Sequence, residues 1–421
     1  MKRLFLCLAA SMLAGPVLAP AALGQGTSAK PSPELLAKVF EEDQLSLEAC
    51  GTPRNVADDY RPTPLFPDQT RAPRLTASDN FTLDVVASGL PNPWALAFLP
   101  SGNYLVTIRG EGLRVVSAEG KTSTPVTGTP AIKNAIRLLG MHDVILDQDF
   151  AYNRTVYLAF VTTPEGKPPT GYIVSAKLSA DEKSLENYTI LREQAGMIPR
   201  RVVQGGDGRL YIHTAEVITP YVTVQNMASP QGKVLRLNPN GSVPGDNPFV
   251  ASKGADAGIW AVGFRDPQGM IIHPVTGELW SIENEPRGGD ELNIVHAGRN
   301  YGFPLISYGR DNDGKLLNGG LTQMAGMEQP VYFWTPSVAL SGMAVYSGDK
   351  FPAWKGDVFA GGLSGMQLIR LKMEDGRVVG EEKLLRDKCK RIRDVRQGPD
   401  GLLYILTDDA NGEIWRLSPK G

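Results

Sequence analysis

The run NEPRGGDELN, residues 284–293, concentrates carboxylate and amide side chains around two glycines. Oxygen ligands of this kind, together with main-chain carbonyls, are those that Ca²⁺ prefers. The run therefore predicts a calcium site formed by its acidic and amide side chains, Asp290 among them, and by exposed main-chain carbonyls. The alternative is an acidic turn whose side chains only fix the loop through backbone hydrogen bonds.

A second candidate site is basic. Arg391 and Arg393 alternate in an extended run, so their guanidiniums point to one face of a strand. Two guanidiniums on one face suit a ligand that carries carboxylates or phosphates. Pairing with neighbouring acids such as Asp394 is the alternative. Arg265 and Asp266 add a further guanidinium beside a carboxylate.

Four histidines occur in the chain. His142 and His213 lie in strand contexts, where each either lines a channel or packs in the core. His273 and His296 lie in turn sequences and are expected to be solvated. The sequence contains no zinc-ligand spacing, Ser-His-Asp order, phosphate-binding loop or dinucleotide fingerprint.

Short strands must position these side chains. The 421 residues include 46 glycines and 32 prolines, well above the roughly 12% combined share that is usual. An excess of turn formers without low complexity predicts many short strands rather than long helices. Extended runs bounded by Pro, Gly and Asn occur at Leu83–Ala87, Trp94–Phe98, Tyr104–Ile108 and Leu113–Val116.

One phrase recurs along the chain: a turn with Gly or Asp, a β-rich run, and a second short strand with Arg or Lys. Its six copies begin at Ser101, Asn153, Asp207, Thr276, Lys355 and Asp400. Repeats of about 40–50 residues that hold about four short strands indicate propeller blades. The chain is therefore predicted to be all-β, a six-bladed β-propeller. A pair of β-sandwiches is the runner-up, but it does not explain six copies.

Three segments are predicted. Residues 1–24 resemble a secretory signal peptide, in which two basic residues precede an apolar stretch that is too short and broken to span a membrane. Residues 25–80 form an N-terminal extension with one helix at Pro33–Asp43. Residues 81–421 form the propeller.

Charge and export limit the possible partners. The 43 basic and 45 acidic residues give a net charge of −2, which does not attract nucleic acid or an anionic membrane. The signal predicts a periplasmic or secreted protein. After its removal the remaining cysteines are Cys50 and Cys389, which an oxidising compartment is expected to join, tying the extension to a late part of the fold. Two unpaired buried cysteines are the alternative.

Seven phrases resemble the soluble quinoprotein glucose/sorbosone dehydrogenases, especially their aldose sugar dehydrogenase branch. They are LPNPWALAFLPSGNYLVT, GKVLRLNPNGSVPGDNPF, FRDPQGM, EPRGGDELNIV, GRNYGFPLISYG, VYFWTPSVALSGMAVY and RIRDVRQGPDG. The resemblance runs from about Asn80 to the C-terminus. It implies a six-bladed propeller that binds pyrroloquinoline quinone (PQQ) and Ca²⁺ above the channel. It also implies oxidation of the anomeric hydroxyl of sugars to lactones, in which a base takes the hydroxyl proton while hydride passes to the quinone.

The resemblance also implies roles for individual residues. Arg265 corresponds to the family arginine that contacts the quinone, and Arg391 and Arg393 correspond to the pair that holds its carboxylates. Glu285 and Pro286 fall where a Gly-Pro pair gives backbone carbonyls to Ca²⁺. The side chain of Glu285 adds bulk and charge at that point.

Departures from the family pattern lie in the chemistry. The family base, a histidine four residues before an arginine, falls on Met197, which cannot take a proton. Glu216 matches the acid that orients the base. The asparagine after the cofactor arginine is Asp266, whose carboxylate is expected to repel a tricarboxylate. A family glutamine and a family lysine fall on Leu138 and Ser364.

Three functions are consistent with this sequence. The first is a PQQ-dependent sugar or alcohol dehydrogenase without the family histidine, in which Glu216, His213 or His142 accepts the proton. The second is a propeller enzyme without quinone that acts as a lyase, isomerase or hydrolase on a small carboxylated or phenolic compound. The third is a non-catalytic periplasmic binding protein. Each acts as a monomer or homodimer on a small molecule, without nucleic acid or a membrane span.

Overall fold

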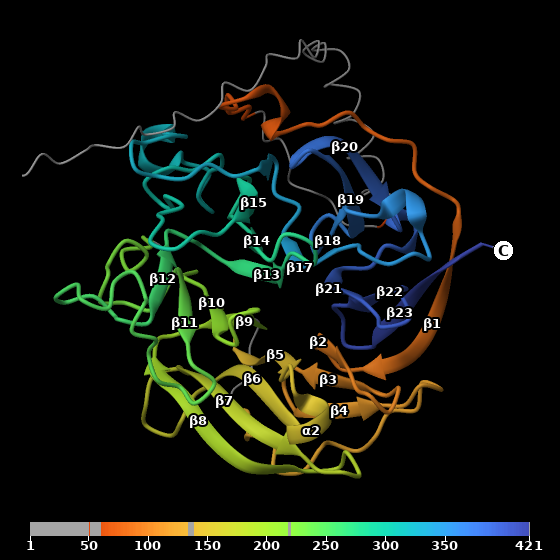
Figure 1. The fold of residues 1–421 in the computed structure, drawn as a ribbon. Helices are drawn as coiled ribbons and strands as arrows, with labels where there is room; N and C mark the ends of the chain where they lie inside the picture. The colour runs from red at the N-terminus through yellow and green to blue at the C-terminus, as the bar shows by residue number, and fades with distance from the viewer. Residues whose placement is uncertain (1–49, 51–59, 134–138, 218–219, 421) are drawn as a thin grey trace, which may run out of the picture.

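The described residues of the computed structural model are 50, 60–133, 139–217 and 220–420. They form six antiparallel sheets arranged around a central channel, so the predicted six-bladed propeller is confirmed (Figure 1). The innermost strands contact one another around the channel. The sandwich alternative is wrong, because every sheet packs against two neighbours in a ring. The predicted signal peptide and the helix at Pro33–Asp43 lie outside the described residues.

The first three blades follow chain order from the channel outwards. Blade 1 comprises β2 (Pro93–Phe98), β3 (Tyr104–Ile108) and β4 (Gly112–Val116). Blade 2 comprises β5 (Gly140–Leu146), β6 (Thr155–Thr162), β7 (Thr170–Leu178) and β8 (Leu185–Ala195). Blade 3 comprises β9 (Pro199–Gln204), β10 (Leu210–Thr214), β11 (Lys233–Leu237) and β12 (Ile259–Val262).

The next two blades repeat this order. Blade 4 comprises β13 (Pro267–Ile272), β14 (Leu279–Glu283), β15 (Asp290–Ile294) and β16 (Tyr332–Trp334). Blade 5 comprises β17 (Leu340–Val345), β18 (Val358–Gly362), β19 (Gln367–Glu374) and β20 (Arg377–Leu384). Helical segments are short: α2 (Phe150–Asn153), η1 (Pro67–Gln69), η2 (Leu317–Gly320), η3 (Pro352–Trp354) and η4 (Arg386–Lys388). No helix in the described part of the chain is long and apolar enough to cross a membrane.

Blade 6 joins the two ends of the propeller sequence. Its strands β21 (Ile392–Gln397), β22 (Leu403–Thr407) and β23 (Gly412–Pro419) come last in the chain, and β1 (Phe81–Leu90) adds to them as the outer strand. The pairing is antiparallel and runs from Phe81 opposite Pro419 to Leu90 opposite Gly412. The first strand of the chain therefore closes the ring, as the neighbouring orange and blue ribbons show (Figure 1).

The hydrophobic core is divided among the blades. Six apolar clusters lie one between each pair of adjacent blades, and the cluster between blades 6 and 1 contains Leu406 and Val106. Because both faces of a sheet are covered in this arrangement, a strand such as β3, with sequence YLVTI, is buried along its whole length. Every predicted copy of the repeated phrase supplies the second strand of a blade, and four copies also supply the third.

The described part of the N-terminal extension crosses the outer edges of blades 4 and 5. The side chain of Thr70 donates to the carbonyl of Phe333 on β16, and the amide of Leu75 donates to the carbonyl of Glu381 on β20. A disulfide joins Cys50 to Cys389, so the predicted pairing is confirmed and the alternative of two free thiols is wrong. Cys389 lies between blades 5 and 6, two residues before Arg391.

Candidate functional site at the channel mouth

Predicted site residues from several blades meet at one end of the channel, which we call the mouth. His142 lies near the start of β5, Arg265 and Asp266 directly precede β13, and Arg391 directly precedes β21. In each blade the innermost strand runs in the same direction along the channel, and β21 does so in blade 6 although β1 joins that blade as its outer strand, so the starts of these strands lie at the same end of the channel. Electrostatic interactions of His142 with arginines of other blades, including Arg393, follow from this convergence.

Arg200 on β9 connects two of the predicted residues. Its Nε donates to Oδ1 of Asp266 over 3.0 Å, and its Nη1 donates to Nε2 of His142 over 3.0 Å. Burial by itself raises the pKa of the Asp266 carboxyl, but the charges of Arg200 and Arg265 outweigh it and lower that pKa. Asp266 therefore carries a negative charge that Arg200 compensates.

His142 is fully buried and neutral. Because a guanidinium can only donate, Nε2 of His142 accepts from Arg200, and Nδ1 carries the proton that it donates to the carbonyl of Pro199 over 2.7 Å. Burial, followed by the charge of Arg200, lowers the pKa of His142 well below its ordinary value. With both nitrogens in hydrogen bonds, His142 orients Arg200 and is not a free base in this arrangement.

Gln268 on β13 extends these contacts to blade 6. Its Nε2 donates to Oδ2 of Asp266 over 2.8 Å, and its Oε1 accepts from Nη1 of Arg393 over 2.5 Å. Nη2 of Arg393 in turn donates to Oδ2 of Asp408 over 2.9 Å. A continuous series of polar contacts thus runs around the mouth from His142 to Asp408.

Asp408 lies among three arginines. Its carboxylate accepts from Arg391 and Arg393 over 2.9 Å each and from Arg109 over 2.7 Å. Burial alone raises the pKa of Asp408, but the three guanidiniums, led by Arg393, hold it well below its usual range. Arg391 and Arg393 do point to one face, as their alternation predicted, and both are paired with the same acid.

The mouth carries an excess of positive charge. Five guanidiniums, from Arg109, Arg200, Arg265, Arg391 and Arg393, accompany a neutral histidine and the carboxylates of Asp266, Asp408 and the neighbouring Glu216, so positive charges outnumber negative ones by two. The buried Nε atoms of three of them have no hydrogen-bond partner among the described residues: Arg109, Arg265 and Arg393. Buried donors of this kind favour a polyanionic ligand over a neutral one.

The other two candidate bases differ in position. The amide of Glu216 donates to the carbonyl of Arg265 over 2.7 Å, and its carboxylate accepts from Thr223, so Glu216 lies beside the mouth. His213 is on β10, the second strand of blade 3, where its Nε2 contacts Oγ of Ser281 over 2.7 Å. Burial lowers the pKa of His213 to about 3. His213 thus belongs to the packing between blades 3 and 4.

Asp290 fixes the loop at the top of blade 4. Its Oδ1 accepts from the amide of Glu285 over 2.9 Å, and its Oδ2 accepts from Ser337 Oγ and the amide of Val338, each over 3.0 Å. The amide of Leu340 adds a contact of 3.3 Å to Oδ2. These donors occupy the carboxylate, which favours the alternative interpretation of the acidic run as a loop held by backbone hydrogen bonds.

Three buried glutamates surround this loop. Burial, followed by the charge of Glu291, raises the pKa values of Glu283 and Glu285 well above the ordinary value. Glu285 accepts from Ser307, and Glu291 accepts from Asn293 over 3.0 Å. In the described residues, no group of three or more Asp, Glu, His or Cys side chains is arranged to hold a metal ion. The side-chain arrangement thus gives no support to Asp290 as a calcium ligand, and the calcium site with the carbonyls of Glu285 and Pro286 stays a prediction.

Met197, to which the resemblance assigned the base position, is fully buried in the apolar cluster between blades 2 and 3, with neighbours that include Val202 and Ile212. A side chain at this position packs in the core. Ser364 is half-buried in the turn between β18 and β19, and Leu138 lies outside the described residues.

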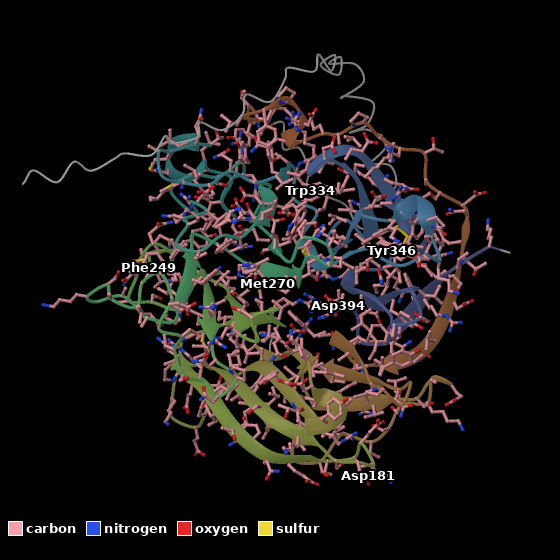
Figure 2. The ribbon with its side chains drawn as sticks, viewed as in Figure 1. Asp181, Phe249, Met270, Trp334, Tyr346 and Asp394 are labelled. Atoms are coloured by element: carbon pink, nitrogen blue, oxygen red, sulfur yellow. A yellow bond between two sulfur atoms is a disulfide. The ribbon has the colours of Figure 1, made fainter. Side chains whose placement is uncertain are left out.

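A second ionic layer lies next to the mouth, among the innermost strands. Arg201 pairs with Asp143 over 3.3 Å and with Asp394 over 2.8 Å, and Arg396 pairs with the same two acids over 3.0 and 2.9 Å. The layer is neutral because two guanidiniums face two carboxylates. Figure 2 shows Asp394 near the centre of the ring and Asp181 at its outer edge. A Cβ on Gly342 would come within 2.2 Å of Asp394 Oδ1, so this position requires glycine.

Sequence reasoning missed four residues of the mouth: Arg109, Arg200, Gln268 and Asp408. Arg200 precedes Arg201 on β9, and the alternation of a strand sends the two side chains to different layers. Gln268 lies two residues after Asp266, a spacing that already indicated a shared face. Arg109 and Asp408 each follow the second strand of a blade, and aligning the six repeated phrases would have placed both at the same end of the channel.

The profile of the family described as Glucose / Sorbosone dehydrogenase matches residues 90–416. Aldose sugar dehydrogenase YliI of Escherichia coli is 40% identical over 349 residues, which cover 80% of this chain and 93% of that protein. Quinoprotein glucose dehydrogenase B of Acinetobacter calcoaceticus is 25% identical, with coverage of 83% and 90%. The crystal structure of the soluble aldose sugar dehydrogenase of E. coli in its apo-form has a TM-score of 0.77 at 38% identity, covering 81% of this chain and all of that one. The chain belongs to the glucose/sorbosone dehydrogenase family.

Proposed function

We propose that this protein is a periplasmic PQQ-dependent sugar or alcohol dehydrogenase that works without the family histidine. The observation that carries the proposal is the excess of positive charge at the mouth, together with buried guanidinium donors that have no hydrogen-bond partner among the described residues. PQQ is a tricarboxylate, so an excess of positive charge favours its binding. The Cys50–Cys389 disulfide supports an oxidising compartment.

The residues present fit the quinone. Arg391 and Arg393 would hold its carboxylates, and Arg265 would contact it from blade 4. When bound, PQQ would supply the acceptor for the hydride of the sugar. Asp408 holds Arg391 and Arg393 at one place, which lowers the entropy lost when they bind an anion.

The protein's own residue for the proton is Glu216. Of the three candidate bases, it lies beside Arg265 at the mouth, whereas His142 has both nitrogens in hydrogen bonds and His213 packs between blades. We therefore assign Glu216 to the removal of the hydroxyl proton. Because the described side chains form no group of three metal ligands, the main-chain carbonyls of Glu285 and Pro286 would be the ones to hold Ca²⁺ at this loop.

The test is quinone uptake by the purified protein, followed by absorbance and equilibrium binding at micromolar PQQ with and without Ca²⁺. We expect the wild type to retain the cofactor and Arg393→Gln to bind at least about tenfold more weakly. Arg416→Gln is the matched control, because Arg416 pairs with Asp84 on the outer strands of blade 6. No uptake by the wild type would contradict the proposal and favour a quinone-free enzyme or a binding protein.

The role of Glu216 has a separate test. In the quinone-loaded protein, Glu216→Gln should lower kcat for aldose oxidation about 10²- to 10⁴-fold, because general-base catalysis is lost. Quinone affinity should be unchanged. Glu278→Gln, in the β13–β14 turn, is the control. Unchanged kcat in Glu216→Gln would contradict the assignment.

A further inference from the structure

We propose that Arg200 is a positioning residue that neutralises Asp266 and so divides the mouth into a paired half and an anion-binding half. This inference rests on the proposed function in that the anion-binding half is the one assigned to the quinone carboxylates. Its ligand class is wider, because the argument applies to any small polycarboxylate.

The paired half is closed on itself. Asp266 is 4% exposed, and its two oxygens accept from Arg200 and Gln268 respectively. Arg200 is 3% exposed and is held between Asp266 and His142. This half contains one positive and one negative charge, so it has no net charge to offer a ligand.

The anion-binding half contains the remaining guanidiniums. Arg109, Arg391 and Arg393 share the single carboxylate of Asp408. Arg265 forms no ion pair with a carboxylate among the described residues, and its Nη1 donates to the carbonyl of Asn284 over 2.9 Å. The excess of positive charge therefore belongs to this half. Arg391 and Arg109 are its most accessible members, with side chains 35% and 14% exposed.

Asp266 is the group that decides whether the two halves stay separate. The charge of Arg200, followed by that of Arg265, lowers the pKa of Asp266 against the effect of burial. These two guanidiniums belong to different halves, so the charge of Asp266 acts on both halves. Without Arg200, the carboxylate would turn to Arg265 and would repel an incoming anion from a buried position, where screening is weak. Arg200 therefore permits anion binding without contacting the anion.

The test is a double-mutant cycle on the full-length protein, with citrate as a polycarboxylate probe and PQQ in parallel, both by equilibrium binding. Arg200→Gln should weaken citrate binding at least about tenfold, because it leaves a buried negative charge beside the site. Asp266→Asn should leave binding within about threefold or tighten it, and the double variant should return to within about threefold of wild type. Arg192→Gln, which breaks the Arg192–Asp256 pair between blades 2 and 3, is the matched control.

The outcomes separate this inference from the proposed function. Citrate binding without PQQ binding would support the inference and overturn the proposed function only. Wild-type binding by Arg200→Gln, a double variant as weak as Arg200→Gln, or a wild type that binds neither probe would each overturn the inference. If thermal unfolding shows that Arg200→Gln is not folded, Arg200→Lys takes its place. A citrate affinity of Arg200→Lys close to that of the wild type supports charge compensation, and a tenfold loss of affinity overturns the inference.

Discussion

Arg201 and Asp394 form an ion pair of 2.8 Å across the centre of the propeller, although 193 residues separate them in the chain. Arg201 also donates to the carbonyl of Gln268 over 2.6 Å, and Asp394 accepts from the amide of Leu96 over 3.3 Å. Through these two residues, blades 1, 3, 4 and 6 are held together at the channel.

Arg201→Met is expected to destabilise the protein by about 3–5 kcal/mol, because it leaves buried carboxylates with too few partners. Denaturant unfolding measures the loss. Lys315→Met, which removes an exposed ion pair with Asp313, should change stability by less than about 1 kcal/mol. Equal effects of the two substitutions would contradict the role given to the neutral layer.

Met197→His should not create a catalytic base. The side chain of Met197 is buried between blades 2 and 3. An imidazole there would lose its hydration without gaining a hydrogen-bond partner, which should lower the free energy of unfolding by about 1–3 kcal/mol. Thermal unfolding and aldose oxidation measure both effects, and Met197→Leu is the volume-matched control. A rise in sugar oxidation in Met197→His would show that this side chain reaches the mouth.

Loss of the Cys50–Cys389 disulfide should destabilise the protein by up to about 5 kcal/mol, since the bond closes a loop with a sequence separation of 339. The Cys50→Ser/Cys389→Ser variant, compared with the wild type with and without reductant, measures this contribution by thermal unfolding. Mass spectrometry under non-reducing conditions should find no free thiol at either position in exported protein.

Stability should fall as the pH rises from about 4.5 to about 8. Burial raises the pKa of Glu291 from an ordinary 4.5 to about 8, so the folded state keeps a proton that the unfolded state releases in this interval. This stability is complete below the unfolded pKa and is lost as the pH approaches the folded one. Glu291→Gln should flatten the profile of melting temperature against pH, and the exposed Glu374→Gln should not.

Excess chelator should leave the melting temperature of the quinone-free protein unchanged. The carboxylate of Asp290 is already satisfied by donors from Glu285, Ser337, Val338 and Leu340, so the loop does not need an ion to hold it. A fall in melting temperature that added Ca²⁺ alone reverses would contradict this expectation, because a bound ion stabilises the native state by mass action.

The fold was predictable because its repeat is local. Each copy of the phrase, such as that beginning at Asp400, contains a turn and at least one whole strand, and six copies determine six blades. The place of β1 was not predictable in the same way. Leu83–Ala87 lies close to Trp94–Phe98 in the chain, but it pairs with β23, and no local pattern encodes a partner so distant in the chain.

The site was predictable where geometry follows from one strand. Alternation placed Arg391 and Arg393 together, and the structure confirms that they share a face. Their partner Asp408 and the compensation of Asp266 by Arg200 depend on contacts between blades. His213 shows the same limit, since a strand context does not reveal whether the strand is innermost or second in its blade.

Because β1 completes blade 6, the propeller cannot close until the last strands of the chain have been synthesised. During synthesis and folding, each new blade can cover the face of the one before it, but blade 1 keeps one face open until β21–β23 arrive beside it. The entropy of joining such distant strands delays that step. We expect a chain that ends before Gly412 to lose more than its last strand, because β1 would lack its partner and the seal between blades 6 and 1 would be incomplete. Ring closure thus makes the stability of the whole propeller depend on the presence of its last strand.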